Sequence, residues 1–385
     1  MAEKLLTLGV IGTSSKENEH RLPIHPEHLP RIEPHLSPQI FVETGYGNRF
    51  GADEDYLRAH TGGIRSREAL FEQCDIILLP KPTPEDFPYF REGQILWGWP
   101  HCVQGKAITQ LGIDKRLTMI AWEAMYVWRS EQTPGMHTFY KNNELAGYGS
   151  TLHALQLQGI TGHYGPHKRA AVISFGSTGR GAVYALRGMG YTDITIYTQR
   201  PSHAVHNQIP ALGYRRYKRA TPNGADVVAG RRGTRTMAEE LGKYDIIVNC
   251  VLQDTDRPLM FIRNAELDRL RPGTLIIDVS CDHGMGFEFA RPTSFESPTF
   301  EVGDRVCYYA VDHSPSYLWN AATDVISESV LPYLPTVMGG PDAWAQNRTI
   351  RKAIEIREGV IQNPKILHFQ KRAETYPHPI RNDAK

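Results

Sequence analysis

Short apolar runs that alternate with longer helical patterns constrain the fold of this chain more than any other feature. Each run is strand-sized and bounded by polar or turn-forming residues, which is typical of strands buried on both faces of a sheet. The runs span 6–11, 39–43, 75–79, 94–97, 118–122, 169–174, 193–197, 245–251 and 274–279. Because strands and helical patterns alternate, the sequence predicts a largely parallel α/β architecture.

Two breaks divide this pattern. A helical segment at 142–159 leads into a joint rich in Gly, His and Pro, directly before a further strand. A second break lies at VDHSPS (311–316), and the helical pattern at 321–331 follows it. We therefore expect two Rossmann-like domains with parallel sheets and a cleft between them. The expected parts are a substrate-binding domain (1–143), a dinucleotide-binding domain (144–312) and a C-terminal segment that packs back on the first domain (313–385).

Composition excludes several classes of partner. The formal net charge of +1 gives no reason to expect nucleic acid or an anionic membrane as a partner. The five cysteines are widely spaced, with no metal-ligand spacing, so we expect neither a bound metal nor a disulfide framework. No apolar run approaches the roughly 20 residues that span a bilayer. A reducing cytoplasm is the predicted location.

A glycine-rich loop follows the strand AAVISF, in the sequence SFGSTGRGAVYALRGMG. Glycines in such a strand–loop–helix let the backbone approach a pyrophosphate at the helix N-terminus. The sequence therefore predicts a cofactor site at Ser174, Gly176, Ser177, Thr178 and Gly179. Ser174 stands at the position of the first glycine, where a small residue fits if its backbone angles stay ordinary. A glycine-rich turn without a ligand is the alternative.

The tip of the next strand bears on which dinucleotide binds. It reads Thr198-Gln199-Arg200-Pro201-Ser202, without the carboxylate that commonly binds the ribose 2′-OH of NAD. Arg200 can pair with a 2′-phosphate, and Thr198 or Ser202 can add hydrogen bonds. NADP is thus favoured over NAD, and a solvated Arg200 is the alternative. For the basic cluster YRRYKRA (214–220), a solvated surface is favoured over a part in the site.

Polar residues also follow several strands of the first half. Arg21, Lys81, His101 and Glu123 each come just after an apolar run. Parallel sheets gather ligand-binding groups at the carboxyl ends of their strands, so these residues can converge. Each has a plainer alternative: a surface ion pair for Arg21, the start of a loop for Lys81, a buried and satisfied imidazole for His101, and a helix cap for Glu123.

The second half places further polar groups after its strands. Asp278 and Asp282 follow the run IIDVSCD, and Asp312 and His313 belong to VDHSPS. Carboxylates directly after a hydrophobic strand can face a cleft, although Asp278 can equally cap a turn.

These motifs together resemble the alanine dehydrogenase and transhydrogenase-type superfamily, and within it the N5-(carboxyethyl)ornithine synthase branch. The resemblance runs from about residue 8 to 334. It is carried by KENEHR, ETGYG, LLPKP, GWPHCVQ, AWEAM, NNELAG, LHALQ, IIDVSCD and VDHSPS. The chain departs from that branch at Ser174, at Thr198, in extra residues between 201 and 235, and in a longer C-terminus.

The resemblance implies reduction, by a nicotinamide cofactor, of an imine formed from a 2-oxo acid and an amine. By the same resemblance, Arg21 grips the oxo-acid carboxylate, Lys81 lies at the keto oxygen and His101 is the catalytic histidine. Asp282 matches a carboxylate beside the nicotinamide, and Glu123 is a candidate partner for the amino-acid ammonium group. The resemblance also implies a homo-oligomer.

The DH-x-PS stretch narrows the expected reaction, because saccharopine dehydrogenases carry a similar stretch. Both branches join a 2-oxo acid to an amino-acid amine, so we predict that Asp312 and His313 contact the substrate. The predicted reaction is NADPH-dependent condensation of a pyruvate-like oxo acid with ornithine or lysine. Alternatives are a saccharopine-type dehydrogenase, an alanine dehydrogenase that uses ammonia, and a regulatory protein that binds a dinucleotide without catalysis.

Overall fold

The computed structural model describes residues 5–222, 224–229, 235–303 and 305–381. The chain divides into two compact units. Unit 1 comprises the chain up to Tyr140 and again from Trp319 onward, and unit 2 comprises Lys141–Leu318. The C-terminal segment therefore completes the N-terminal unit rather than forming a unit of its own.

Unit 1 is built on an eight-stranded sheet, in the order β21-β20-β6-β5-β4-β1-β2-β3. From β3 to β6 all neighbours are parallel, whereas β20 pairs antiparallel with β6 and with β21. The strands are β1 (Leu8–Val10), β2 (Ile40–Glu43), β3 (Gly63–Arg65), β4 (Ile76–Leu79), β5 (Ile95–Gly98), β6 (Thr118–Ala121), β20 (Ile354–Arg357) and β21 (Val360–Ile361).

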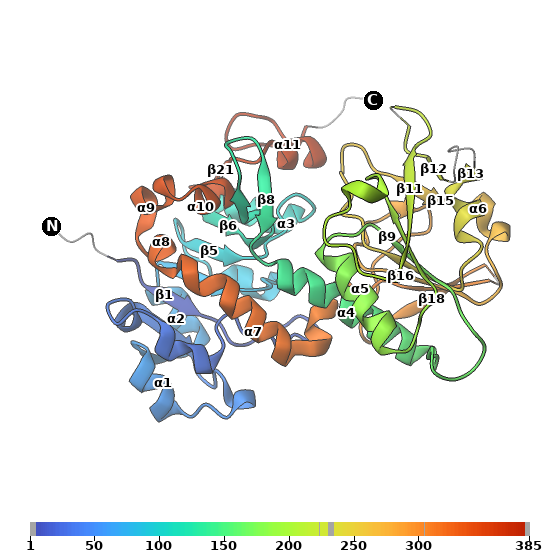
Figure 1. Ribbon diagram of the computed structural model, residues 1–385. Helices are drawn as coiled ribbons and strands as arrows, with labels where there is room; N and C mark the ends of the chain where they lie inside the picture. The colour runs from blue at the N-terminus through green and yellow to red at the C-terminus, as the bar shows by residue number, and fades with distance from the viewer. Residues whose placement is uncertain (1–4, 223, 230–234, 304, 382–385) are drawn as a thin grey trace. The chain divides into compact units, whose positions relative to one another are not determined.

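Helices cover this sheet, and two apolar cores form against it. The helices are α1 (Glu54–His60), α2 (Arg67–Gln73), α3 (Lys106–Asp114), α7 (Trp319–Val330), α8 (Leu334–Met338), α9 (Gly340–Gln346), α10 (Arg348–Ala353) and α11 (Pro364–Gln370). A hairpin of β7 (Tyr126–Trp128) and β8 (Pro134–His137) follows β6 (Figure 1). Helix α7 belongs to the C-terminal segment and is bonded to the N-terminal part of this unit. Its Thr323 Oγ1 accepts a hydrogen bond from the Leu22 amide at 3.0 Å.

Unit 2 holds a nine-stranded sheet, in the order β13-β12-β11-β10-β9-β14-β16-β19-β18. The six strands from β11 to β19 are parallel, and β12, β13 and β18 pair antiparallel at the edges. The strands are β9 (Ala170–Ile173), β10 (Ile194–Thr198), β11 (Gly213–Arg219), β12 (Val227–Ala229), β13 (Arg235–Thr236), β14 (Ile246–Asn249), β16 (Thr274–Asp278), β18 (Thr299–Val302) and β19 (Val306–Tyr309).

Three helices, α4 (Tyr140–Leu157), α5 (Ser177–Gly188) and α6 (Met237–Leu241), accompany this sheet, together with a small pair of strands, β15 (Met260–Ile262) and β17 (Gly286–Phe287). Glycines set the contact between α4 and α5. A Cβ at Gly147 would lie 1.8 Å from the Thr178 oxygen, and one at Gly181 would lie 1.7 Å from the Glu144 oxygen. The two backbones therefore touch, and α4 supports the start of α5 (Figure 1).

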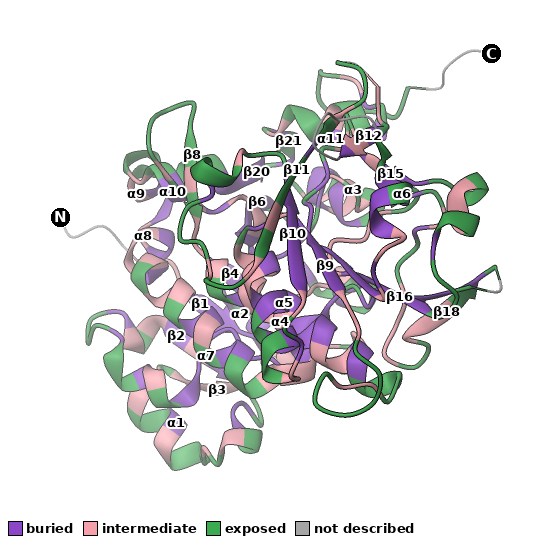
Figure 2. Ribbon diagram, turned by 45° about the vertical axis from the view of Figure 1, so that its right-hand side comes forward, coloured by how far each residue is buried: buried purple, intermediate pink, exposed green. Residues whose placement is uncertain are grey.

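The expected α/β class is confirmed, and every apolar run named above overlaps a strand. These central strands are buried along their length, as Figure 2 shows for β9, β10 and β16. The antiparallel edge strands were not expected, because short runs such as IEIR and TFEV mix charged and apolar residues. The parallel strands β3, β11 and β19 were not predicted either. No helix in the described part of the chain is long and apolar enough to cross a membrane.

Candidate functional site

The carboxyl edge of the unit 1 sheet brings three predicted residues together. Lys81 follows β4, His101 follows β5, and Glu123 lies in a 3-10 turn, η5 (Trp122–Ala124), after β6. Lys81 Nζ lies 2.8 Å from His101 Nε2. The His101 backbone N–H donates to Glu123 Oε1 at 2.7 Å. Neighbouring parallel strands thus place a cation, an imidazole and a carboxylate in one group.

The contacts of His101 show which of its two ring nitrogens carries the proton. A lysine ammonium has only donors, so Lys81 donates to Nε2 and the neutral imidazole carries its proton on Nδ1. Nδ1 lies 3.9 Å from Glu123 Oε1, beyond hydrogen-bond distance. The His101 backbone is left-handed, with φ of 49°, which is uncommon outside glycine and is found at functional sites. Nearly half of the side chain is exposed, so the buried-histidine alternative does not hold.

Arg21 is buried rather than presented at the surface. Its guanidinium donates from Nε to Glu19 Oε1 at 2.7 Å, and its Nη2 contacts Glu19 Oε2. Both side chains are only 2% exposed, and the guanidinium lies 5.4 Å from the Trp99 ring centroid. A bidentate grip on a substrate carboxylate would require Glu19 to leave. Glu19 was not anticipated, although it stands two residues before Arg21 in the motif KENEHR.

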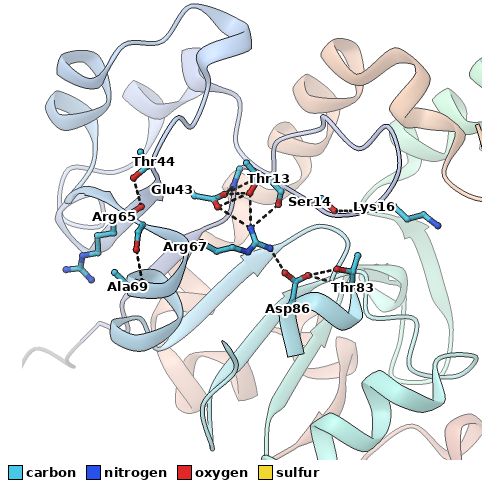
Figure 3. Close-up of polar contacts among 12 residues, drawn as sticks. Thr13, Ser14, Lys16, Glu43, Thr44, Arg65, Arg67, Ala69, Thr83 and Asp86 are labelled. Atoms are coloured by element: carbon cyan, nitrogen blue, oxygen red, sulfur yellow. Dashed lines mark hydrogen bonds and ion pairs between the residues drawn. The ribbon is translucent and has the colours of Figure 1, made fainter. Parts of the chain in front are cut away.

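A second buried charge cluster positions two loops of this edge (Figure 3). Glu43, the last residue of β2, accepts hydrogen bonds from the amides of Gly12 and Thr13 at 2.7 and 2.8 Å. Arg67 bridges Glu43, at 3.2 Å, to Asp86. Asp86 in turn accepts from the Thr83 amide at 2.7 Å. The loop that leads to Arg21 and the loop that follows Lys81 are thus tied together through Arg67.

Glu355 brings a second carboxyl group to Glu123. It lies on β20, which pairs with β6 just before Glu123, at an irregularity of register. Glu355 Oε1 accepts from Asn363 Nδ2 at 2.8 Å, whereas Oε2 of Glu355 and Oε2 of Glu123 are both buried without a hydrogen-bond partner. Desolvation raises the pKa of both carboxyls, and the charge of Glu355 raises the pKa of Glu123 further. Repulsion between the two negative charges favours protonation of one of the carboxyls, of which Glu355 is buried and Glu123 has a side chain that is 26% exposed.

The glycine loop of unit 2 takes the expected strand–loop–helix form, between β9 and α5. The condition of ordinary backbone angles at Ser174 is not met, because its φ is 79°. Strand pairing and helix packing fix the backbone conformation at Ser174. The Ser174 amide donates to the Tyr197 oxygen at 2.7 Å, and a Cβ at Gly179 would lie 2.5 Å from the Ser174 oxygen. Ser174 therefore adopts the glycine-like conformation without being glycine.

A cavity of about 520 Å³ opens beside this loop, wholly within unit 2. Ser174, Gly176, Thr198 and Arg200 line it, all of them predicted cofactor residues. A Cβ at Gly176 would meet nothing within 4 Å, so the backbone there is open to a ligand. A phosphate-bearing ligand fits this loop, since Gly176 precedes the N-terminus of α5 and the rim carries arginine.

The other predicted cofactor residues lie around this loop. Ser177 and Thr178 begin α5, and Gly179 packs against the end of β9. Ser202 begins a short 3-10 turn, η6 (Ser202–Ala204), and is not one of the residues that line the cavity. The Thr198 hydroxyl accepts a hydrogen bond from the Arg200 amide at 3.2 Å, which shapes the strand tip.

Two further arginines line this cavity, one from the basic cluster for which a solvated surface was favoured and one that was not anticipated. Arg219, the last residue of β11, lines the cavity and donates to backbone oxygens of Gly224 and Pro258 at 2.7 and 3.2 Å. The solvated-surface interpretation of YRRYKRA is therefore wrong for this residue, because β11 lies beside β10 in the sheet. Arg257 also lines the cavity and reaches it from the loop after β14.

The acidic residues of unit 2 differ in exposure. Asp278 is buried at the end of β16, where it accepts from Tyr308 Oη at 2.5 Å and Asn249 Nδ2 at 2.8 Å. Burial raises the pKa of Asp278 to about 7. Asp282, four residues later, is partly exposed, and desolvation raises its pKa as well. Asp282 is thus the better placed of the two to meet a ligand.

The DHSPS segment forms a compact turn. His313 Nδ1 contacts Asp312 Oδ1, with the imidazole 1% exposed and the Asp312 side chain 42% exposed. The His313 ring packs edge-on against Phe295, at 5.0 Å between centroids. Ser316 closes the turn by donating to the His313 oxygen. His313 therefore stands behind Asp312, and Asp312 presents the exposed carboxylate.

Comparison with known proteins places these features in a family. Residues 10–145 match the N-terminal domain of alanine dehydrogenase/PNT, and residues 154–364 match its C-terminal domain. The chain is 28% identical to the N(5)-(carboxyethyl)ornithine synthase of Clostridium botulinum, over 81% of this chain and 89% of that protein. It is 24% identical to the alanine dehydrogenase of Mycobacterium tuberculosis, over 92% of this chain and 95% of that protein.

Solved structures agree on the fold. An L-alanine dehydrogenase superposes with a TM-score of 0.72 at 19% identity, covering 94% of this chain and 99% of that one. Both family models match, and together they span both units. The chain therefore belongs to the alanine dehydrogenase/PNT family of NAD(P)-dependent oxidoreductases.

Proposed function

We propose that this protein catalyses the NADPH-dependent condensation of a pyruvate-like 2-oxo acid with the side-chain amine of ornithine or lysine. The product is an N-(carboxyalkyl) amino acid. The contact between Lys81 and His101 carries the proposal, because it sets a cationic donor beside an acid–base group. Similarity to N(5)-(carboxyethyl)ornithine synthase supports the choice of an amino-acid amine over ammonia.

Different residues of unit 1 carry out the steps that precede reduction of the imine. Lys81 donates a hydrogen bond to the keto oxygen and polarises the carbonyl. The neutral amine attacks the carbonyl carbon, and His101 moves protons at Nε2 as the carbinolamine forms and loses water. Glu19 occupies Nε and Nη2 of Arg21. Arg21 therefore reaches the oxo-acid carboxylate through Nη1.

The residues of unit 2 hold the cofactor and the charge of the imine. When bound, the nicotinamide supplies the hydride that converts the imine to a secondary amine. Gly176 and the start of α5 hold the pyrophosphate. Arg200 and Arg219 hold the 2′-phosphate, which favours NADP over NAD. Asp282 and Asp312 are the carboxylates proposed to stabilise the iminium and contact the amino acid.

The first test follows NADPH absorbance with pyruvate alone, and then with ornithine, lysine or ammonia added in turn. Oxidation that requires a diamino acid is the expected result. Oxidation with ammonia makes the protein an alanine dehydrogenase, and a requirement for 2-oxoglutarate with lysine makes it a saccharopine-type enzyme. If every mixture fails with NADPH and with NADH while the dinucleotide still binds, the protein is a non-catalytic binder and the proposal is overturned.

Assembly and location are separate proposals. We propose a homo-oligomer in a reducing cytoplasm, with the five cysteines as free thiols. Light scattering on the purified chain measures its mass, and a monomer at working concentrations would contradict the first of these.

A further inference from the structure

A second cavity, of about 450 Å³, lies wholly within unit 1. It opens between the loop after β1 and the loop after β2, and its lining includes Glu19 together with Gly12 and Thr13, whose amides donate to Glu43. Its polar lining includes Lys16, Asn18, Glu19, His20, Asn48 and Arg49. Because Glu19 is the partner of Arg21, a ligand in this cavity lies next to the Glu19–Arg21 pair.

A constrained turn carries Arg49, an exposed residue, at the edge of this cavity. It is the middle residue of a 3-10 turn, η3 (Asn48–Phe50), between Gly47 and Gly51, whose φ values are 74° and 77°. A Cβ at Gly47 would lie 2.8 Å from Pro26 Cγ, so only glycine fits that position. The Arg49 guanidinium lies 5.8 Å from the ring centroid of Trp319. The turn and the ring together limit where the guanidinium can go.

The charges around the cavity favour an anion. Glu19 is the carboxylate among the described lining residues, and the Arg21 guanidinium already neutralises it. Arg49 and Lys16 add positive charge. Burial and the nearby Arg49 charge lower the pKa of His20, so that imidazole is neutral at pH 7 and acts as a hydrogen-bonding group. A carboxylate group therefore complements the positive charge of this cavity.

We propose that this cavity is the subsite for the α-carboxylate of the amino-acid co-substrate, with Arg49 as its main charged contact. The inference rests on the proposed function, since it deepens the choice of a diamino acid. An N–H donor of Arg49 pairs with the carboxylate, and the amide oxygens of Asn18 and Asn48 are acceptors for the α-ammonium group. A simple diamine, which lacks the carboxylate, leaves Arg49 without its partner.

The experiment compares ornithine with putrescine, its decarboxylated counterpart, in the wild type and in Arg49→Gln. A charge-assisted hydrogen bond contributes enough for a preference of roughly 10- to 100-fold, so wild-type kcat/KM should favour ornithine by that factor. Arg49→Gln should reduce kcat/KM for ornithine about 10-fold or more, through KM, and that for putrescine much less. Arg49→Lys should restore part of the preference. The KM for the oxo acid should change less than twofold.

Arg58→Gln is the matched control, because Arg58 is exposed on α1 and pairs with Glu54 outside the cavity. The inference is overturned if Arg49→Gln lowers activity with both amines equally, or with neither. If no amine supports turnover, the proposed function fails and calorimetric titration with ornithine decides the inference separately. Binding that weakens in Arg49→Gln with an unchanged melting temperature then supports the subsite, and equal binding in both proteins overturns it.

Discussion

The two units share one sheet plan but arrange its carboxyl edge in opposite ways. In each, six parallel strands follow the order third, second, first, fourth, fifth, sixth, with antiparallel strands added at an edge. Unit 1 fills this edge with side-chain charges in contact with one another, such as Glu19 with Arg21 and Lys81 with His101. Unit 2 instead lines this edge with the backbone of a glycine loop, beside a cavity. Its Arg219 is bonded to backbone oxygens and not to a carboxylate.

This difference shows that topology decides where a site lies, and that the loops decide its chemistry. An edge of paired charges can polarise a carbonyl and move protons. An open backbone with arginines at its rim suits a ligand that brings its own charge, such as a dinucleotide. Changes in unit 1 should therefore alter turnover and pH dependence, whereas changes in unit 2 should alter cofactor affinity and local stability.

The largest expected effect is on turnover, from His101→Ala in unit 1. Loss of a general acid–base group costs about 10²- to 10⁴-fold in kcat. Dinucleotide affinity, measured by fluorescence titration, should stay within twofold of the wild type because the cofactor cavity belongs to unit 2. His35→Ala, at an exposed position in unit 1, serves as the control. An unchanged kcat in His101→Ala would remove His101 from the mechanism.

The next effect belongs to unit 2 and concerns the choice of cofactor. Arg200→Gln should reduce kcat/KM for NADPH about 10- to 100-fold, since a charge-assisted contact with the 2′-phosphate is lost. The value for NADH should change less than threefold. Arg271→Gln tests another exposed arginine of the same unit, which pairs with Asp245. Equal losses with both dinucleotides would assign Arg200 a part other than 2′-phosphate recognition.

Glu355→Gln tests the carboxyl pair in unit 1 through pH. The raised pKa values mean that the native state holds a proton which the unfolded chain loses near pH 4.5. The unfolding free energy should therefore fall as pH rises from 5 toward the raised pKa values, by up to about 1.4 kcal/mol per pH unit for each proton. Glu355→Gln removes one carboxyl and the like charge beside Glu123, so this fall should become smaller.

Tryptophan fluorescence reports this unit selectively, because all six tryptophans lie in unit 1. Urea unfolding at pH 5.5, 6.5 and 7.5 gives the slope for each protein. Glu72→Gln, at an exposed position on α2, should reproduce the wild-type slope. A Glu355→Gln slope as steep as that of the wild type would show that the two carboxyls titrate independently.

The smallest effect is a gain in stability in unit 2. Ser174→Gly should raise the unfolding free energy by about 1 kcal/mol, because glycine adopts a φ of 79° without the steric cost that serine incurs. Calorimetry suits this measurement, since unit 2 has no tryptophan among its residues. Ser177→Gly, within the first turn of α5, should lower stability by about 0.5–1 kcal/mol. If both variants changed the unfolding free energy in the same direction, the backbone strain inferred at Ser174 would be contradicted.

Apolar runs predicted nine of the strands, whose burial on both faces is recorded in a continuous apolar stretch. The parallel strands β3, β11 and β19 were not predicted. The edge strands escaped notice for the opposite reason. Glu355 looks like a surface residue in the sequence IEIREG, yet it is 4% exposed because β20 pairs with β6. Likewise, Arg219 looked solvated among its basic neighbours, although β11 carries it to the cofactor cavity.

The sequence by itself determined the α/β class, the glycine loop, the residues at the strand ends and the family, because each depends on local pattern or on short motifs. Only the tertiary structure decided how those residues are partnered. It showed Glu19 bound to Arg21, and Arg67 between Glu43 and Asp86. It also brought Glu355 near enough for its charge to raise the pKa of Glu123. Partners far apart in the chain meet only when the sheet assembles, and their charges depend on burial that no short stretch of sequence records.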